Sequence, residues 1–329
     1  MKNITALTVL VTIICFFFTV NFAFSDTAGR NYIFSIGPQA GFVYGQALEL
    51  VFSVPGDTKG ELLSELKWDM KPVFYTGLQM EFSRADITRA AGFFSLLSFK
   101  AGFPKDSGII ENRDWMSTEN GELTHFSSHT NRTRLFFLLD TSIGVSLPVG
   151  PVFYVKPFIS GSWMHFAFTG RNGSGQYARV KTSFPVTYHP IDDNPFLYTF
   201  ENEVIRYNQN WFSIAPGLAL GANVFSSFFL EIFFKASPLT YCTAMDEHLT
   251  TDAVYKDYIS GGFFLEPGGR FSFIKGRFEF SFNFSYRHIG TSKGDSYINR
   301  YNSSYWISPN KAGAGLGMAD SCFLVKIRI

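Results

Sequence analysis

Two short runs in this 329-residue chain combine residue types that could do acid–base chemistry, and the first is the tripeptide Asp246-Glu247-His248. Residues two apart in an extended chain point to the same side, so Asp246 and His248 would share one side and Glu247 would take the other. A carboxylate beside an imidazole can orient the ring, which favours a general-base role for the histidine. On its own, such a tripeptide is more typical of a solvated surface loop than of a catalytic pair.

The second run has the same spacing, with Asn112 and Asp114 on either side of Arg113. In an extended strand Asn112 and Asp114 would also share a face. This run is equally weak when it is taken alone. The remaining histidines stand in no better supported pattern: His125, His129, His165, His189 and His288.

The segments that must position these residues show a two-residue period. Between Arg277 and Arg287, aromatic residues alternate with polar and charged ones, and the aromatic row is Phe278, Phe280, Phe282, Phe284 and Tyr286. The C-terminus repeats the pattern, with Phe323, Val325, Ile327 and Ile329 on one face and Leu324, Lys326 and Arg328 on the other. Five aromatic residues on one face suit lipid better than a soluble core, so the pattern predicts membrane-facing strands.

Strands in hydrocarbon must pair every backbone N–H and C=O within the protein, which requires closure into a barrel. The predicted fold class is therefore all-β, a transmembrane antiparallel β-barrel of about ten strands with long extracellular loops. A soluble two-sheet sandwich is the alternative, but its strands would rarely carry Arg and Glu opposite a row of Phe. The expected strands are Tyr32 to Val54, Glu61 to Phe82, Thr88 to Phe103, Arg134 to Leu147, Val152 to Thr169, Trp211 to Val224, Phe228 to Thr243, Lys256 to Phe273, Arg277 to Ile289, and Gly313 to Ile329.

The connections between these strands alternate in length, which predicts the orientation of the barrel. Tight connections are expected at Pro148 to Pro151, Phe225 to Ser227 and Ile274 to Gly276. Long polar connections are expected at Lys105 to Thr133, Arg171 to Asn210, Asp246 to Tyr255 and Gly290 to Ala312. In outer-membrane barrels the short turns face the periplasm and the long loops face outward.

The N-terminus has the pattern of an export signal. Lys2 precedes a mostly apolar stretch from Ala6 to Val20, and Ala23-Phe24-Ser25 is a small-x-small cleavage pattern. We expect a signal peptide at residues 1–25 and a single barrel domain at residues 26–329. A retained transmembrane helix is the alternative, because the apolar stretch nearly reaches the length that spans a bilayer. The two cysteines after the signal, Cys242 and Cys322, are predicted to be free thiols.

The composition agrees with a membrane barrel and excludes one class of partner. The chain is 46% hydrophobic and 18% aromatic, with 39 Phe, yet its mean hydropathy is only +0.06. That balance suits alternating strands better than long apolar runs. The formal net charge is +1 and no basic block is present, so the sequence gives no case for nucleic acid as a partner.

Several short motifs together resemble the omptins, a family of ten-stranded outer-membrane endopeptidases. The resemblance extends thinly over nearly the whole predicted mature chain, and the motifs stand in the family's order. They are Gly45 with Glu49, Leu66-Lys67-Trp68, Arg113-Asp114-Trp115-Met116, Phe168-Thr169-Gly170-Arg171, Asp246-Glu247-His248, Thr291-Ser292-Lys293-Gly294, and Asn310-Lys311-Ala312-Gly313-Ala314-Gly315.

The resemblance implies a site at the outward rim, where an Asp–His pair and a facing pair of aspartates activate water for attack on a peptide bond. The Asp–His pair corresponds to Asp246 and His248, and the second facing aspartate corresponds to Asp114. His248 would be the general base, Asp246 would orient it, and Asp114 would help to hold the water. No metal or other cofactor is implied. The implied partners are peptide or protein substrates and outer-membrane lipid, and a monomer is expected.

Two single positions and one cluster of three residues depart from the family pattern. Asn112 stands where the first facing aspartate is expected, and an amide can position water but cannot accept its proton. Glu49 matches one acidic group of the substrate pocket for a basic residue, but Ala244 stands at the other. One carboxylate would attract Arg or Lys less strongly than two. The lipopolysaccharide-contact cluster corresponds to Gly161, Trp163 and His165, so lipopolysaccharide dependence is not carried over, and Trp163 fits an aromatic girdle equally well.

The sequence therefore predicts an omptin-like endopeptidase at the extracellular rim of the barrel. Two alternatives stay open at this stage. One is a catalytically silent barrel of the same fold that serves as an adhesin or receptor, which differs from the enzyme by what Asn112 does. The other is a small-solute channel, which is disfavoured because Arg277, Glu279 and Arg287 would fill a narrow lumen.

Overall fold

The computed structural model describes residues 32–53, 62–116, 121–184, 186–225, 227–300 and 306–329. The predicted signal peptide at residues 1–25 lies outside this part of the chain. Within the described ranges, no helix is long and apolar enough to cross a membrane.

The described residues form one antiparallel sheet of thirteen strands and a separate two-stranded hairpin, β7–β8. The long strands are β1 (Tyr32–Phe52), β2 (Leu62–Arg84), β5 (His125–Val149), β6 (Phe153–Tyr177), β9 (Phe196–Phe225), β14 (Phe278–Arg300) and β15 (Trp306–Arg328). The shorter strands are β3 (Gly92–Gly102), β4 (Lys105–Asp114), β7 (Val180–Ser183), β8 (Val186–Tyr188), β10 (Phe228–Ser237), β11 (Thr240–His248), β12 (Ala253–Ser260) and β13 (Phe264–Lys275).

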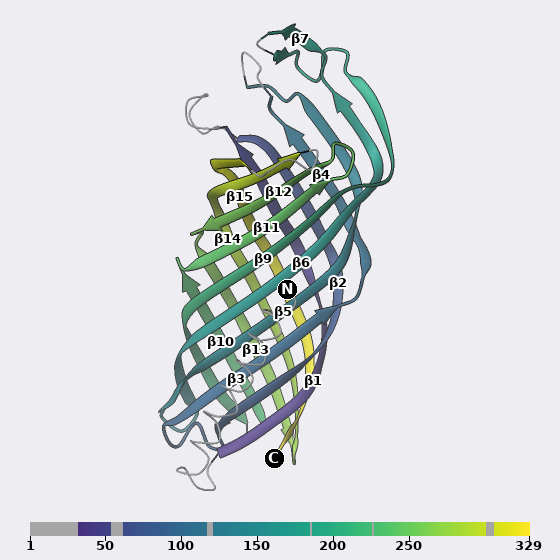
Figure 1. The fold of residues 1–329 in the computed structure, drawn as a ribbon. Helices are drawn as coiled ribbons and strands as arrows, with labels where there is room; N and C mark the ends of the chain where they lie inside the picture. The colour runs from purple at the N-terminus through teal and green to yellow at the C-terminus, as the bar shows by residue number, and fades with distance from the viewer. Residues whose placement is uncertain (1–31, 54–61, 117–120, 185, 226, 301–305) are drawn as a thin grey trace.

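The sheet closes into a barrel because β1 pairs with β15, which pairs in turn with β14. In three places, two short strands that follow one another in the chain pair with the same neighbouring strand, so together they cross the barrel wall once. These pairs are β3 with β4, β10 with β11, and β12 with β13. Counted in this way, the described strands make ten passes, as the alternation predicted. Figure 1 shows the tilted strands of the barrel and the β7–β8 hairpin standing at one end.

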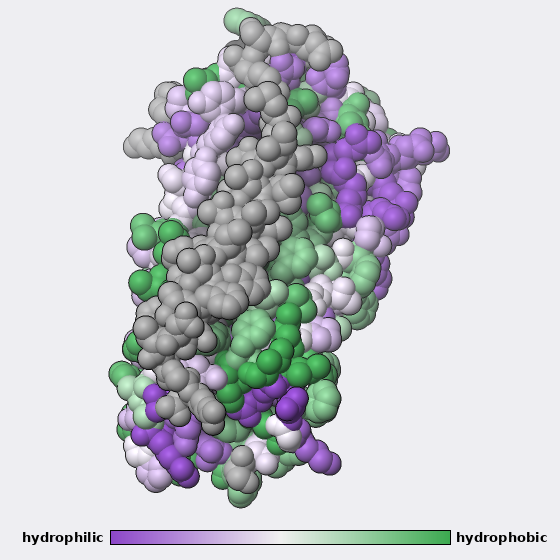
Figure 2. All heavy atoms as spheres, turned by 60° about the horizontal axis from the view of Figure 1, so that its bottom comes forward, coloured by the Kyte–Doolittle hydropathy of each residue, from purple (hydrophilic) through white to green (hydrophobic). Residues whose placement is uncertain are grey.

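The lipid-facing side of the barrel is the aromatic face that the sequence predicted. On β14, the side chains from Phe278 to Tyr286 that alternate outward are each 39% to 49% exposed. On β15, Phe323 is 70% exposed, whereas Leu324 and Lys326 are each 1% exposed. Figure 2 shows apolar side chains gathered across the middle of the visible surface, with hydrophilic ones toward both ends. This belt is the surface expected of a barrel embedded in a membrane.

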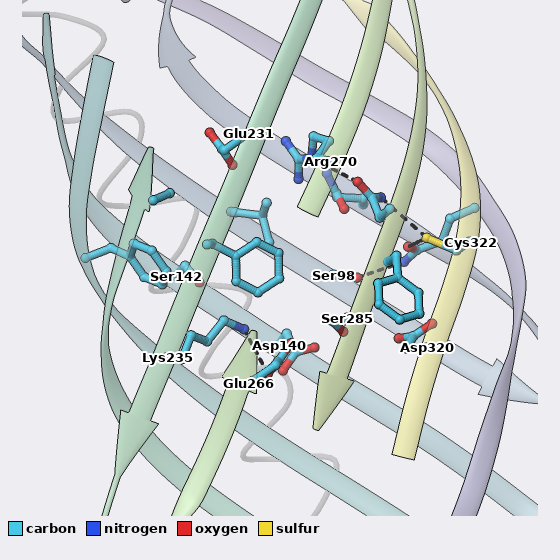
Figure 3. Close-up of a pocket in the computed structure, with 18 of the residues that line it drawn as sticks. Ser98, Asp140, Ser142, Glu231, Lys235, Glu266, Arg270, Ser285, Asp320 and Cys322 are labelled. Atoms are coloured by element: carbon cyan, nitrogen blue, oxygen red, sulfur yellow. Dashed lines mark hydrogen bonds and ion pairs between the residues drawn. The ribbon is translucent and has the colours of Figure 1, made fainter. Parts of the chain in front are cut away.

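At the level of this belt, the lumen is filled by charged side chains that form ion pairs with one another. Arg287 donates to Asp140 (3.1 Å) and Glu266 (2.8 Å), and Glu266 also accepts from Lys235 (3.2 Å). Further pairs join Lys100 to Asp320, Lys156 to Glu231, Arg270 and Lys326 to Glu81, and Lys326 to Glu279. Figure 3 shows Lys235, Glu266 and Asp140 grouped on one side of a small internal cavity of about 130 Å³. Such filling is what a narrow ten-pass barrel favours, and it leaves little room for a solute channel.

One residue expected in the lumen is placed elsewhere. Arg277 lies in the turn between β13 and β14 and is exposed, so its assignment to the lumen and to the start of a strand was wrong. Gly276 has a φ of 61°, which places the tight turn one residue later than expected. Glu279 and Arg287, the other two residues named for the lumen, both point inward and are paired there.

The predicted long loops are largely paired strands, which corrects the expected boundaries. Most of the segment from Lys105 to Thr133 belongs to β4 and the start of β5, and β9 begins at Phe196, well before the expected Trp211. Similarly, β14 continues to Arg300 through the segment expected to be a loop. These extensions stand beyond the lipid belt, where polar side chains are tolerated on the outer face, so the alternation that signals a strand is lost while the backbone pairing continues.

The two cysteines of the described chain are both free and buried, as predicted. Cys242 lies on β11 and Cys322 on β15. Cys322 Sγ accepts from Asn283 Nδ2 (3.4 Å) and contacts Gln39 Oε1 (3.8 Å), so its thiol belongs to the polar lining of the lumen.

Candidate active site

A bulge in β4 directs Asn112 and Asp114 toward the barrel interior. The pairing of β4 with β5 shifts register between Asp106 and Gly108, and Gly108 has a φ of 114°. A Cβ at Gly108 would lie 2.6 Å from the Cβ of Asp69, so glycine is required on both counts. Asp69 Oδ2 then accepts from the Ile109 N–H (3.2 Å), which fixes the strand as it leaves the bulge.

Paired interruptions on the opposite wall redirect the strands that carry Asp246 and His248. Pro238 separates β10 from β11 and has no N–H to donate to a sheet. Alongside it, Gly261 and Gly262, with φ of 88° and 92°, separate β12 from β13. The Thr240 hydroxyl donates to both glycine carbonyls, at 2.8 Å for Gly262, and so joins the two interruptions. The upper segments β11 and β12 therefore pair with each other as a unit.

These segments surround a cleft of about 270 Å³ at the end of the barrel that carries the β7–β8 hairpin and the extended strands. All five residues predicted for the site line it. The lining comprises Glu49, Leu50, Val51, Leu63, Ser64, Leu66, Asn112, Asp114, Met116, Asp246, His248, Tyr255, Asp257, Ser296, Arg300, Lys311 and Ala312. The outward side chains beside the cleft are polar pairs such as Lys67 with Glu65 (3.0 Å), so the cleft stands beyond the lipid belt.

Asp246 and His248 form a direct pair. The Nε2 atom of His248 lies 2.5 Å from Oδ2 of Asp246, and Asp246 is 2% exposed. Burial lowers the pKa of His248, but the charge and hydrogen bond of Asp246, together with the charge of Asp114, outweigh it and raise the pKa above its ordinary value. Glu247 points outward and lies 4.0 Å from Arg206, as the alternation predicted. The imidazole can therefore accept a proton and hold it.

Asn112 and Asp114 lie on the opposite wall of the cleft and contact each other. Asn112 Nδ2 donates to Asp114 Oδ2 (3.4 Å), and Asn112 Oδ1 accepts from the Ser64 hydroxyl (3.2 Å). Burial raises the pKa of Asp114, although hydrogen bonds from Ser64 and Asn112 and the charge of His248 act in the opposite direction. Glu111 is paired with Arg113 (3.1 Å) and does not line the cleft, so it does not take the place of the aspartate that Asn112 lacks.

Glu49 lies deeper in the cleft and is buried, at 4% exposure. Its Oε2 accepts from the Trp68 indole N–H (3.2 Å), and Trp68 stacks between Phe168 and Tyr207, which holds the indole in place. Burial raises the pKa of Glu49 well above its ordinary value, and the charges of Asp246 and Asp257 raise it further.

Asp257 also lines the cleft, although no motif in the sequence predicts it as a site residue. It lies on β12 and is paired in register with Ala244 on β11, the position where the family's second acidic pocket group was expected. Burial raises the pKa of Asp257 to about 7, with the charge of Asp246 adding to the rise and a hydrogen bond from Ser296 opposing it. Its neighbours in the sequence form no motif. The one signal in the sequence was the absence of an acid at Ala244, and the pairing of β11 with β12 is needed to connect that absence with Asp257.

The described residues contain no group of three or more His, Cys, Asp or Glu side chains placed to hold a metal ion. What the cleft offers is one imidazole, several carboxylates and an amide around a space that a peptide segment can enter. These are groups that can accept and donate protons, as general acid–base chemistry requires.

The fold and the site together define a transmembrane barrel that carries a cleft with carboxylates and an imidazole at one rim. Comparisons with known proteins show which family of barrels this chain belongs to. The Omptin family model matches residues 30–325, so the chain belongs to the omptin family. Omptins are outer-membrane proteases, and the rim that bears the cleft faces the cell exterior. No curated protein sequence matches the chain.

A solved structure shows the same fold. The crystal structure of the outer membrane protease OmpT from Escherichia coli matches with a TM-score of 0.78 at 17% identity, covering 90% of this chain and 97% of OmpT. The toluene transporter TodX from P. putida is 11% identical, covering 92% of this chain and 91% of its own, but its TM-score is only 0.30. The chain therefore shares the fold of OmpT.

Proposed function

We propose that this chain is an endopeptidase that hydrolyses peptide bonds in the cleft between β4 and β11, as a membrane-embedded monomer acting on peptide or protein substrates. The observation that carries the proposal is the buried Asp246 carboxylate hydrogen-bonded to His248 in the same cleft as Asp114. Membership of the omptin family supports it. No cofactor takes part in the proposed reaction.

In the proposed reaction, His248 is the general base. A water molecule attacks the carbonyl carbon of the scissile bond while its proton passes to the free nitrogen of the imidazole. Asp246 holds the ring by its other nitrogen and stabilises the imidazolium as it forms. The same proton is then donated to the leaving amine as the C–N bond breaks. The products are a carboxylic acid and an amine, and His248 returns to its neutral state.

Asp114 and Asn112 are proposed to position the water. The Asp114 carboxylate can accept a hydrogen bond from it, whereas Asn112 is already fixed between Ser64 and Asp114. An amide cannot accept the proton of water, so a single aspartate would act on this side of the cleft. We therefore expect catalysis that is slower than two facing aspartates would give.

Glu49 is proposed to contribute to substrate binding. Its buried carboxylate lies in the wall of the cleft, where it attracts a cationic side chain of the substrate. The indole of Trp68 donates to Oε2, and Glu49 also shares a hydrogen bond with the side chain of Asp246, so both contacts fix the carboxyl group in the wall of the cleft.

The proposal is tested by incubating the purified, refolded barrel with peptides that carry two adjacent basic residues and identifying the products by mass spectrometry. We expect cleavage by the wild type, and a rate about 10² to 10⁴ times lower for His248→Ala. His189→Ala, which changes a histidine outside the cleft, is the matched control and should retain the wild-type rate. Intact peptides after incubation with a barrel that has folded and inserted would instead favour a catalytically silent receptor or adhesin.

A further inference from the structure

We infer that Asp257 is a specificity-determining residue that, together with Glu49, binds a positively charged arginine or lysine side chain of the substrate. This inference deepens the proposed function and rests on it for the identity of the ligand as a peptide. It reverses the expectation from the sequence that a single carboxylate, Glu49, would serve this role.

Asp257 is buried in the wall of the cleft, and one of its carboxylate oxygens lacks a hydrogen-bond donor among the described residues. It is 6% exposed and lines the cleft, yet its Oδ1 atom has no hydrogen-bond partner within the described part of the chain. A buried carboxylate oxygen without a partner is costly, and natural structures rarely keep one unless a ligand or ion completes it. The Ser296 hydroxyl acts on the carboxylate but leaves Oδ1 unsatisfied.

The charges around Asp257 specify the ligand as a cation. Glu49 and Asp246 interact electrostatically with it and with each other, and Asp246 is engaged by His248. Glu49 and Asp257 remain without a cationic partner among the pairs described for the cleft. Burial and mutual repulsion destabilise their charged forms in the empty cleft, and one guanidinium or ammonium group would relieve both effects.

Two cations of the chain itself, Arg300 and Lys311, also line the cleft, but neither is among the groups that shift the pKa of Asp257. Arg300 donates to the Tyr255 hydroxyl (3.1 Å). The pKa of Lys311 is lowered by burial and by the nearby positive charge of Arg300, so the charged group that shifts the pKa of Lys311 is another cation. Asp257 is therefore left for a cation of the substrate.

The pairing of β11 with β12 explains how an acid on β12, Asp257, can replace the acid that the family pattern places on β11 at Ala244. Ala244 is buried and lies directly opposite Asp257, and its methyl side chain offers no polar group to the Asp257 carboxylate. Opposite residues on antiparallel strands have Cβ atoms roughly 5 Å apart. A carboxylate on either strand would consequently reach nearly the same point in the cleft.

The test compares two peptides that differ only in the residue before the scissile bond, which is arginine in one and its uncharged isostere citrulline in the other. We expect wild type to prefer arginine in kcat/KM. Asp257→Asn should lower the arginine-to-citrulline ratio about 10- to 100-fold, the range for loss of a hydrogen bond to a charged group. Asp252→Asn, which removes an equal charge from the exposed β11–β12 turn, should leave the ratio unchanged. A ratio that Asp257→Asn does not alter would overturn the inference.

Rescue separates specificity from damage to the fold. In an Asp257→Ala background, Ala244→Asp returns a carboxylate to the same region and should restore at least part of the arginine preference. If the ratio does not recover although the double variant folds and cleaves the citrulline peptide, Asp257 does not act through its charge and the inference fails.

A binding measurement keeps the inference distinct from the proposed reaction. The His248→Ala barrel is titrated with both peptides while tryptophan fluorescence is followed, since Trp68 contacts Glu49. Absence of cleavage by wild type would refute the reaction. Tighter binding of the arginine peptide, lost in His248→Ala/Asp257→Asn, would still uphold the cation site, and equal binding of the two peptides would overturn it.

Discussion

Buried carboxylates are paired with cations in the membrane-spanning half of the barrel, whereas they cluster with one another in the half beyond the lipid belt. In the first, the buried carboxylates of the lumen meet lysine or arginine at hydrogen-bonding distance, as Glu266 meets Arg287 and Lys235. In the second, Glu49, Asp246 and Asp257 crowd one cleft, where Asp246 pairs with a histidine, and Asp246 and Asp257 each keep one oxygen without a hydrogen-bond partner among the described residues.

The difference indicates which charges serve the fold and which serve chemistry. Charges that neutralise one another fix the packing of the lumen and have no free capacity for a ligand. Carboxylates held close together in a partly enclosed cleft cost stability, and perturbed groups of this kind concentrate at functional sites. Two sets of predictions follow, one on stability in the lumen and one on activity in the cleft.

The largest effect on stability is expected in the lumen at Arg287. Arg287→Leu leaves Asp140 and Glu266 without their main partner, and breaking a buried pair in this way costs about 3 to 5 kcal/mol. Arg113→Leu, which breaks the exposed pair with Glu111, should cost about 1 kcal/mol or less. Urea unfolding in lipid vesicles, followed by tryptophan fluorescence, measures both. Similar costs for the two variants would show that the lumen network is not structural.

A smaller cost is expected for a charge on the lipid face. Phe282→Arg places a cation in the apolar belt and should cost about 2 to 4 kcal/mol at mid-bilayer. Ser285→Arg lies on the same strand but lines the internal cavity, near Asp320, and should cost less. The same unfolding assay applies. The reverse order would mean that the two faces of β14 have been exchanged.

In the cleft, Asn112→Asp is expected to raise activity. It adds a second carboxylate beside Asp114, increases the pull on the proton of water and stabilises the imidazolium of His248. A gain of about tenfold or more in kcat/KM on dibasic peptides is expected, which corresponds to roughly 1.4 kcal/mol. Asn112→Ser, which is polar but uncharged, is the control. A fast wild type that Asn112→Asp does not improve would show that Asp114 alone suffices.

The smallest expected change is a shift in pH dependence. Neutral His248 is the active form in the proposed reaction, so kcat/KM rises with pH through a pKa that stands above the ordinary histidine value. Asp246→Asn removes the main group that raises this pKa, and the acidic limb should move to lower pH as the maximum rate falls. A citrulline peptide is used for the measurement because ionisation of Asp257, with a pKa of about 7, would otherwise change arginine binding over the same range. An unmoved acidic limb would mean that it reports a group other than His248.

The sequence predicted the part of the fold that lipid constrains. A row of outward aromatic residues such as Phe280 and Phe282 is a strong signal, because each alternate position must face hydrocarbon. Beyond the belt no such constraint acts, so the sequence pattern does not predict the upper parts of β9 and β14 as strands. Arg277 was misplaced for a related reason, since alternation alone does not show where a strand ends and a turn begins.

The site was predicted by the resemblance to the omptins, which assigned a role to pairs of polar residues that spacing alone places on one face of a strand. Asp246 with His248 and Asn112 with Asp114 are such pairs, and the structure brings both into one cleft. Asp257 was missed because its relation to Ala244 is a pairing between two strands, and register across a turn is set by the fold. A single sequence without that register gives no means of placing a lone aspartate.

The central claim, that Asp246 and His248 act as one catalytic unit, is tested most directly by a double-mutant cycle on kcat/KM for one dibasic peptide. Asp246→Asn, His248→Ala and the double variant are compared with the wild type under the same refolding conditions. Since Asp246 acts through His248, the double variant should be no slower than His248→Ala alone. Losses that multiply, so that the double variant is slower by the product of the two single effects, would contradict the claim.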